Sequence, residues 1–186
     1  MKLDGITKNY GEKAVLNNLS LTIPDNTVTA ILAPSGSGKT TLLRIITGLE
    51  KPDSGNVIFT KAEKFSYLFQ EDRLLPFCSV LENIKFAGAD ENTALSFIEA
   101  VGLKGEENSL PGALSGGMKR RAALARALAC PGYTVLLLDE PFNGQDESNK
   151  QKLIALIKKE TVGKTCIVIT HSPDDAKSLT DSIITL

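Results

Sequence analysis

The chain has 186 residues, of which 42% are hydrophobic and 23% charged, a composition typical of a globular protein and not of a disordered, fibrous or disulfide-rich chain. Its 21 basic and 22 acidic residues give a formal net charge of -1, so no long-range field attracts a nucleic acid or an anionic membrane. No apolar run approaches the roughly 20 residues that cross a bilayer. We therefore expect a cytoplasmic protein with no nucleic-acid partner.

The amino-terminal part of the chain predicts antiparallel β structure, then a strand and a helix. Residues 16–23 and 56–59 lie between turn signals and predict hairpin-like antiparallel strands. Residues 27–32 predict a strand, and residues 39–49 predict the helix that follows it.

The second half of the chain begins with a helical stretch and then alternates strands with helices. Residues 135–138 and 166–169 are apolar at every position, which is typical of parallel strands covered on both faces. The expected elements are a helical region at 80–130, strands at 134–139, 165–170 and 182–186, and helices at 148–160 and 173–179.

These elements predict one α/β domain over residues 1–186. Its core is expected to have a mixed sheet, with an antiparallel β part at the amino-terminal end, and to comprise residues 1–70 and 131–186. A helical subdomain, residues 71–130, is expected as an insert in that core.

The stretch from Ala33 to Thr41 has the pattern of a phosphate-binding loop between a strand and a helix. The glycines let backbone N–H groups face phosphates, Lys39 can neutralise phosphate oxygens, and the Thr40 hydroxyl can bind Mg²⁺. Ala33 stands where a glycine is usual, and it would be strained by about 1 kcal/mol if its φ were positive. The alternative is a chance Gly-Lys-Thr at a helix start. The residues predicted to bind a nucleoside triphosphate are Ala33, Pro34, Ser35, Gly36, Ser37, Gly38, Lys39, Thr40 and Thr41.

Two carboxylates, Asp139 and Glu140, end a buried strand at the edge where open α/β sheets bind ligands. We expect Asp139 to hold Mg²⁺ and Glu140 to polarise an attacking water, although such pairs also serve as helix caps. His171 ends the next strand and should lie on the same edge. A lone histidine is more often structural.

The segment Leu114–Met118 predicts the start of a helix that runs to about residue 130. Ser115 is a good N-cap, but Gly116 and Gly117 weaken a first turn, so helix stability explains them poorly. They would instead expose backbone N–H groups to a second anion. The basic run at residues 119–121 is interpreted as a solvated helix face without a functional role.

These features, in this order along nearly the whole chain, resemble the ATP-binding-cassette (ABC) ATPases. The resemblance rests on the phosphate loop, Gln70, the segment Leu114–Met118, the strand ending at Asp139 and Glu140, Asp146 and His171. It implies a P-loop NTPase core, the ABC ATPase fold, ATP hydrolysis, and ATP and Mg²⁺ as cofactors.

The resemblance also implies a role for each matching residue. Tyr10 takes the place of an aromatic residue that stacks on adenine, and Gln70 that of a glutamine contacting Mg²⁺ and the attacking water. His171 matches a histidine that contacts the γ-phosphate, and Asp146 an aspartate that couples two sites across a head-to-tail dimer. The catalytic set is then Glu140, His171 and Gln70, the metal set is Thr40, Gln70 and Asp139, and the segment closing over ATP of the opposite chain is Ser115, Gly116 and Gly117.

Besides Ala33, this chain departs from the family pattern at two places. The segment Leu114–Met118 resembles the signature segment of the family, in which glutamine usually stands in place of Met118. Asn143-Gly144-Gln145 stands where Ser-Ala-Leu is commoner. Both departures lie where the resemblance places the dimer contact.

The leading hypothesis is the ATPase subunit of an ABC transporter. It is expected on the inner face of the cell membrane, peripherally bound to transmembrane permease subunits and paired with a second ABC ATPase chain, identical or not. Residues 70–77 resemble the corresponding stretch of importers of nitrate, sulfonate and taurine, and residues 74–81 would form much of the groove for a permease helix. The alternatives are a soluble ABC ATPase in repair, translation or cofactor assembly, and a nucleotide-binding scaffold that does not hydrolyse ATP.

Overall fold

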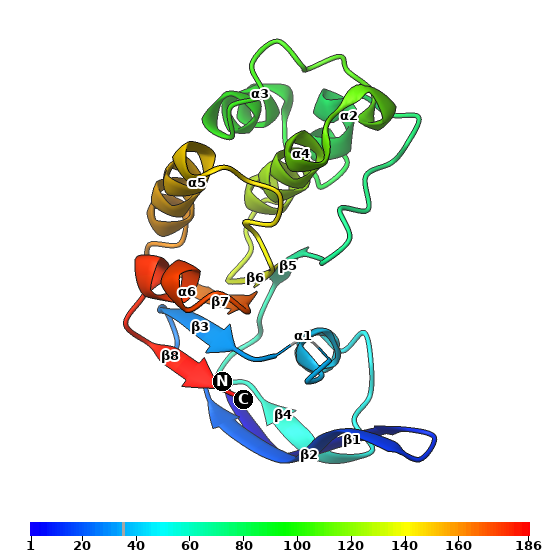
Figure 1. Cartoon of the computed structure of the whole chain (residues 1–186), viewed down its shortest axis with the longest axis vertical. Coiled ribbons are helices and arrows are strands. Elements are labelled where there is room, and N and C mark those ends of the chain that lie inside the picture. Colours follow the sequence, from blue (N-terminus) through cyan, green and yellow to red (C-terminus); the bar gives the residue numbers. More distant parts are fainter. Residues whose placement is uncertain (35) are drawn as a thin grey trace.

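The strands of the protein form two sheets, and helices lie on both sides of the larger one (Figure 1). The computed structural model describes residues 1–34 and 36–186. Ser35 of the phosphate loop therefore lies outside the described residues. Within these residues no helix has the length and apolar character needed to cross a membrane.

The smaller sheet is antiparallel and contains a strand absent from the predicted elements. That strand, β1 (Lys2–Tyr10), lies between β2 (Lys13–Thr22) and β4 (Ser54–Ile58), the antiparallel strands that the sequence does predict. The register of β1 against β2 shifts beside Gly5, whose φ is +62°. This irregularity breaks the alternation of buried and exposed residues by which a strand is found in a sequence.

The larger sheet has the order β5-β6-β7-β3-β8, and all its neighbouring strands are parallel. The predicted α/β fold with an antiparallel amino-terminal part is thus confirmed, with its parallel and antiparallel strands divided between two sheets. The five strands are β3 (Val28–Leu32), β5 (Phe65–Leu68), β6 (Val135–Asp139), β7 (Thr165–Thr170) and β8 (Ile183–Thr185). Of these, β5 is absent from the predicted elements.

Alternate side chains of β6 and β7 belong to two hydrophobic cores. Leu137 and Ile169 pack in the core that contains α1 (Lys39–Ile46) and the antiparallel sheet. Leu136 and Val168 pack in the core that contains α4 (Gly116–Ala129) and α5 (Glu147–Glu160). Every residue of both strands is buried, as expected for a parallel sheet covered on both faces. The helix after the phosphate loop is thereby held between the two sheets (Figure 1).

The helix α1 is shorter than predicted, because it ends at Ile46 instead of residue 49. Gly48, just beyond the end, has a φ of +73°, and its N–H donates to the Ile45 carbonyl. A glycine in this left-handed conformation is a common way to end a helix.

The helical region predicted at residues 80–130 contains three α-helices and a short 3₁₀ turn, Pro111–Ala113. The helix α2 (Val80–Lys85) begins with a capping box of Ser79 and Glu82, and α3 (Glu91–Ala100) is capped by Asp90. Both helices pack against α4 in the upper part of Figure 1. The remaining helix, α6 (Pro173–Leu179), follows β7. The domain boundaries given above stay a prediction.

Candidate functional site

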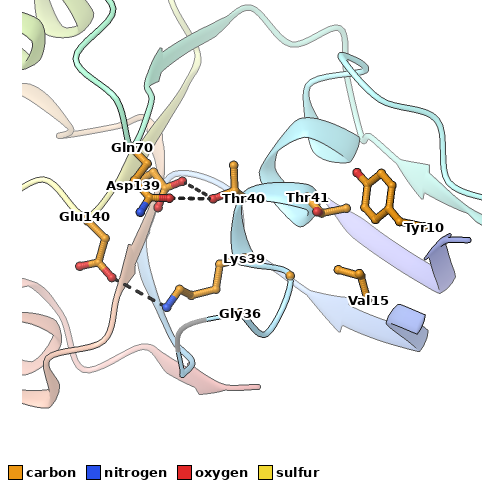
Figure 2. Close-up of a pocket in the computed structure, with 10 residues that line it drawn as sticks. Tyr10, Val15, Gly36, Lys39, Thr40, Thr41, Gln70, Asp139 and Glu140 are labelled. Carbon is orange, nitrogen blue, oxygen red and sulfur yellow. Dashed lines mark hydrogen bonds and ion pairs between the residues drawn. The ribbon is translucent and has the colours of Figure 1, made fainter. Parts of the chain in front are cut away.

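A cavity of about 300 Å³ lies where α1 begins and β6 ends (Figure 2). Its walls come from the antiparallel sheet, the phosphate loop, the segment after β5 and the carboxyl end of β6. The lining residues are Tyr10, Val15, Gly36, Gly38, Lys39, Thr40, Thr41, Gln70, Asp139 and Glu140. All but Val15 were expected from the sequence.

Two glycines of the phosphate loop have backbone conformations that disfavour a side chain, and Gly38 also has no room for one. Gly36 and Gly38 have φ angles of +81° and +87°, which L-residues rarely adopt. A Cβ on Gly38 would come within 2.7 Å of a Val15 methyl group and 2.9 Å of the Val15 carbonyl oxygen. The antiparallel sheet thus approaches the loop so closely that only glycine is accommodated at position 38.

Lys39 is the first residue of α1, and its side chain is buried. Its Nζ donates to the carbonyls of Ala33, at 2.6 Å, and Pro34, at 3.2 Å, and lies 3.8 Å from Glu140 Oε1. The ammonium group is therefore held over the concave side of the loop. There it adds to the positive end of the α1 dipole, which favours an anion.

Three side-chain oxygen atoms that could bind a metal ion lie close together beside Lys39, and they come from different elements. The Thr40 hydroxyl donates to Asp139 Oδ2 at 2.9 Å, and Gln70 Oε1 lies 3.4 Å from the same Thr40 oxygen (Figure 2). Burial raises the pKa of Asp139, an effect that the hydrogen bond from Thr40 opposes and the neighbouring Glu140 charge increases. Among residues 1–34 and 36–186, no three His, Cys, Asp or Glu side chains gather as a metal-binding group. One carboxylate with a hydroxyl and an amide oxygen suits Mg²⁺, which is usually held by few protein ligands together with substrate phosphates.

Glu140 follows β6 in an unusual backbone conformation. Its φ is +52°, and its N–H donates to the Ile169 carbonyl of the neighbouring strand. The carboxylate is largely buried, and Oε1 lies 2.9 Å from Nδ1 of His171. The predicted meeting of Glu140 and His171 at one edge of the sheet is therefore present.

Tyr10 lies at the far end of the cavity from Glu140 (Figure 2). It is 47% exposed, and its hydroxyl forms a short hydrogen bond with Glu50. Thr41, the last residue of the predicted loop, lies beside Tyr10 (Figure 2). A flat, half-exposed ring at this position can stack on a planar group.

The residues of the signature segment lie outside this cavity. Ser115 caps α4 by accepting from the Met118 N–H at 3.2 Å, and Ser115 and Gly116 are exposed. Asp146 is also exposed and caps α5, with Oδ1 accepting from the Asn149 N–H at 2.8 Å. Ser115, Gly116 and Asp146 are therefore predicted site residues that lie apart from the cavity.

Two glycines bring the signature segment and the segment before Asp146 together. A Cβ on Gly117 would lie 2.6 Å from the Gly144 carbonyl oxygen, whereas one on Gly116 would meet open space. Gln145 Nε2 donates to the Gly117 carbonyl at 3.0 Å. Residue 145, one of the departures from the family pattern, is thus a contact between these two segments.

A family model described as ABC transporter matches residues 16–143, more than two thirds of the chain. The chain belongs to the ABC transporter family. It is an ABC ATPase, which binds ATP and hydrolyses it to power a transporter.

Similar proteins cover most of this ABC ATPase. The chain is 38% identical over 187 residues to the aliphatic sulfonates import ATP-binding protein SsuB 1 of Shouchella clausii (strain KSM-K16), a match that covers 98% of this chain and 75% of the relative. It is 41% identical over 181 residues to the formylaminopyrimidine import ATP-binding protein ThiZ of Halalkalibacterium halodurans, covering 91% and 72%. It is 37% identical over 196 residues to the intermembrane phospholipid transport system ATP-binding protein MlaF of Escherichia coli (strain K12), covering 92% and 72%.

Solved structures of ABC cassettes have the same fold. The dimeric structure of MJ0796, a bacterial ABC transporter cassette, matches with a TM-score of 0.91 at 32% identity, over 100% of this chain and 93% of that one. A dimeric post-hydrolysis state of the same cassette, bound to ADP and Pi, matches with a TM-score of 0.86 at 32% identity, over 98% and 95%. The expected ABC ATPase fold is confirmed.

Sequence reasoning missed two residues of this ABC ATPase site. Val15 lines the cavity, and only the pairing of β2 with the unpredicted β1 brings it there. The interpretation of residues 119–121 as a solvated face is wrong for Arg120, which is only 3% exposed. Because Arg120 stands between two other basic residues, its burial could not be predicted from the sequence pattern.

Proposed function

We propose that the cavity binds ATP with its phosphates on the loop and its adenine beside Tyr10. The observation that carries this proposal is the meeting of Lys39, Thr40, Gln70, Asp139 and Glu140 at the start of α1. One cavity thus holds a cation, oxygen atoms suited to a metal ion, and a carboxylate that can act as a base. All of them surround the position that a γ-phosphate would take.

The oxygen atoms of Thr40, Asp139 and Gln70 would hold Mg²⁺. When bound, that ion would neutralise charge on the β- and γ-phosphate oxygens. Lys39 would exchange its bonds to the loop carbonyls for bonds to phosphate oxygens, which is a short movement for a flexible side chain.

Glu140 would accept the proton of the attacking water as the new bond to the γ-phosphorus forms and the bond to the β-phosphate oxygen breaks. Its neighbours support this role, because Lys39 and His171 both lie beside Oε1. Because Nδ1 of His171 faces Glu140, the other ring nitrogen, Nε2, would be left for a contact with a phosphate oxygen.

This arrangement supplies only part of an ATP site. Ser115 and Gly116 are exposed at the start of α4, away from the cavity, and Gly117 beside them is half-buried. The first N–H groups of a helix have no partner within the helix. We propose that in a head-to-tail dimer they close over the γ-phosphate held by the second chain. Asp146, near the same surface, would couple the two sites.

Paired substitutions test the residue roles. We expect Lys39→Ala to weaken binding of a fluorescent ATP analogue, and Glu140→Gln to preserve binding while steady-state turnover falls by about 100-fold or more. The wild-type chain without Mg²⁺ should bind ATP and not hydrolyse it. Turnover near the wild-type value in Glu140→Gln would mean that Glu140 is not the general base.

The partner of this ATPase is proposed to be a transmembrane permease, and the direction of transport import. Support comes from relatives named as import ATP-binding proteins and from the exposed Phe77, which is 92% accessible in the segment before α2. A ring exposed to this extent has little contact within the chain and is accessible to a partner. The protein would then lie peripherally on the inner face of the membrane.

A pull-down from solubilised membranes tests this contact. We expect Phe77→Ala to lower recovery of the permease, whereas Val162→Ala, which also removes an exposed apolar side chain, should leave recovery unchanged. Equal recovery with both variants would count against the proposed surface.

A further inference from the structure

Arg120 is a buried cation whose guanidinium bonds mainly to backbone oxygens. Nη1 donates to the carbonyls of Phe69, at 2.6 Å, and Gln70, at 3.1 Å. Nε and Nη2 donate to the Glu140 carbonyl at 3.2 and 3.1 Å, and Nη2 also makes a short hydrogen bond to the Asp139 carbonyl. Its only carboxylate partner among the described residues is Asp72, at 3.1 Å.

The acceptors of Arg120 belong to the proposed catalytic residues and their neighbours. One pair of carbonyls follows β5 and includes that of Gln70, and the other pair ends β6 at Asp139 and Glu140. These segments are about 70 residues apart in sequence. A planar guanidinium with five N–H donors can bond to both segments at once, which a single ammonium nitrogen cannot do equally well.

The unusual backbone conformation of Glu140 is stabilised in part by Arg120. A φ of +52° is uncommon for a residue with a side chain, so it is maintained by its surroundings. Two N–H groups of Arg120 donate to the Glu140 carbonyl, which also accepts a longer bond from the Asn143 N–H at 3.3 Å, while the Glu140 N–H donates to the Ile169 carbonyl. The direction of the Glu140 carboxylate therefore depends on the guanidinium.

Arg120 also belongs to the helix that presents the signature segment. It lies on α4, which begins at Gly116 directly after the Ser115 cap. A displacement of the start of α4 would thus be transmitted through one buried side chain to the backbone of Gln70 and Glu140.

We propose that Arg120 is a positioning residue that fixes Gln70, Asp139 and Glu140 relative to the signature helix. When the start of α4 closes over the ATP held by the second chain, Arg120 then aligns these three residues in the ATP site of the first chain. This inference rests on the proposed roles of Gln70, Asp139 and Glu140. Arg120 does not line the cavity, so its loss should affect the chemical step more than ATP binding.

The test compares Arg120→Lys with a matched control on the same helix, Arg126→Lys. Arg126 donates to the carbonyls of Asp72 and Arg73, so it holds the segment after β5 but not the end of β6. For each variant the readouts are kcat, the Kd for a fluorescent ATP analogue, and the thermal unfolding midpoint. Arg120→Gln, which removes the charge and keeps an N–H donor, serves as a second variant.

We expect Arg120→Lys to lower kcat by about tenfold or more, because small displacements of reacting groups are costly, with the Kd close to wild type. Arg126→Lys should keep most of its kcat even where its unfolding midpoint falls. The inference is overturned if Arg120→Lys keeps the wild-type kcat. It is also overturned if Arg120→Lys and Arg126→Lys lose kcat and thermal unfolding midpoint to the same extent, or if neither Arg120→Lys nor Arg120→Gln folds.

Glu140→Gln, measured in parallel, separates this inference from the proposed function. If Glu140→Gln hydrolyses ATP at the wild-type rate, the proposed function fails at its general base. If Glu140→Gln is inactive and Arg120→Lys is not, only the inference about Arg120 fails.

Discussion

At the scale of single residues, Ala33 is the family departure that the structure explains directly. Positive φ angles occur at only four non-glycine residues of the described chain, namely Asn18, Asn26, Arg73 and Glu140. Ala33 is therefore not in the conformation that would strain it. It is buried and contributes a carbonyl to Lys39, which any residue can do.

The two glycines of the signature segment have different reasons to be glycine. Gly117 lies against the backbone of Gly144, so it has a packing reason that the sequence alone does not reveal. Gly116 has open space around its Cα. This leaves access of a ligand to the start of α4 as the explanation for Gly116.

A pair of substitutions separates these reasons in the absence of ATP. Gly116→Ala is expected to raise the free energy of unfolding by up to about 1 kcal/mol, because alanine favours a helix. Gly117→Ala is expected to lower it by about 1–3 kcal/mol, because its Cβ would displace Gly144. Urea denaturation of both variants measures the difference. Equal stability of the two variants would show that the approach of Gly117 to Gly144 does not constrain residue 117.

Residues with local sequence signals could be predicted, and residues placed by tertiary contacts could not. The phosphate loop and the Asp139–Glu140 pair follow apolar strands, so both the pattern and the topology indicate them. Arg120 has no such signal. Its burial follows from carbonyls brought together by two strands distant in sequence.

At the scale of elements, most strands and the helical regions were predicted, whereas β1 and β5 were not. Every residue of β6 and β7 is apolar or buried, so these strands are recognisable without their partners. β1 has register shifts and a glycine with positive φ, so only its pairing with two neighbours identifies it. Val15 was missed for the same reason.

The N-cap of α3 gives a prediction about pH. Asp90 accepts from the Thr93 hydroxyl at 2.6 Å and from the Thr93 N–H at 2.9 Å, and these bonds lower the pKa of its carboxyl from 3.8. A carboxyl with a lowered folded pKa adds stability above the unfolded pKa, and that stability is lost as the pH falls through the folded pKa.

We therefore expect Asp90→Ala to have a lower thermal midpoint than the wild type at neutral pH. The difference should shrink as the pH falls below 3.8. Asp90→Asn keeps a side-chain oxygen for the cap but not the charge, so its midpoint at neutral pH should lie between those of Asp90→Ala and the wild type. Circular dichroism melting curves over a pH series provide the measurement. A difference between Asp90→Ala and wild type that stays constant through acid would contradict the role of the charged cap.

At the scale of the whole molecule, two cores divide the protein about the parallel sheet. One core joins α1 to the antiparallel sheet that contributes Tyr10 and Val15, and the other joins α4 and α5 to the helical region. The phosphate loop and the signature segment thus belong to different layers of one chain (Figure 1). This separation is what the proposed head-to-tail dimer requires, because each chain would supply a different half of each ATP site.

The proposed dimer, in its simplest form, encloses ATP between two copies of this chain. The most direct measurement is the molar mass of Glu140→Gln by light scattering after size exclusion, with and without ATP and Mg²⁺. We predict the monomer mass without nucleotide and twice that mass with ATP, because ATP that is not hydrolysed holds the dimer closed. Addition of Lys39→Ala to Glu140→Gln should abolish the dimer. A Glu140→Gln chain that binds ATP and keeps the monomer mass would contradict ATP-driven pairing of identical chains.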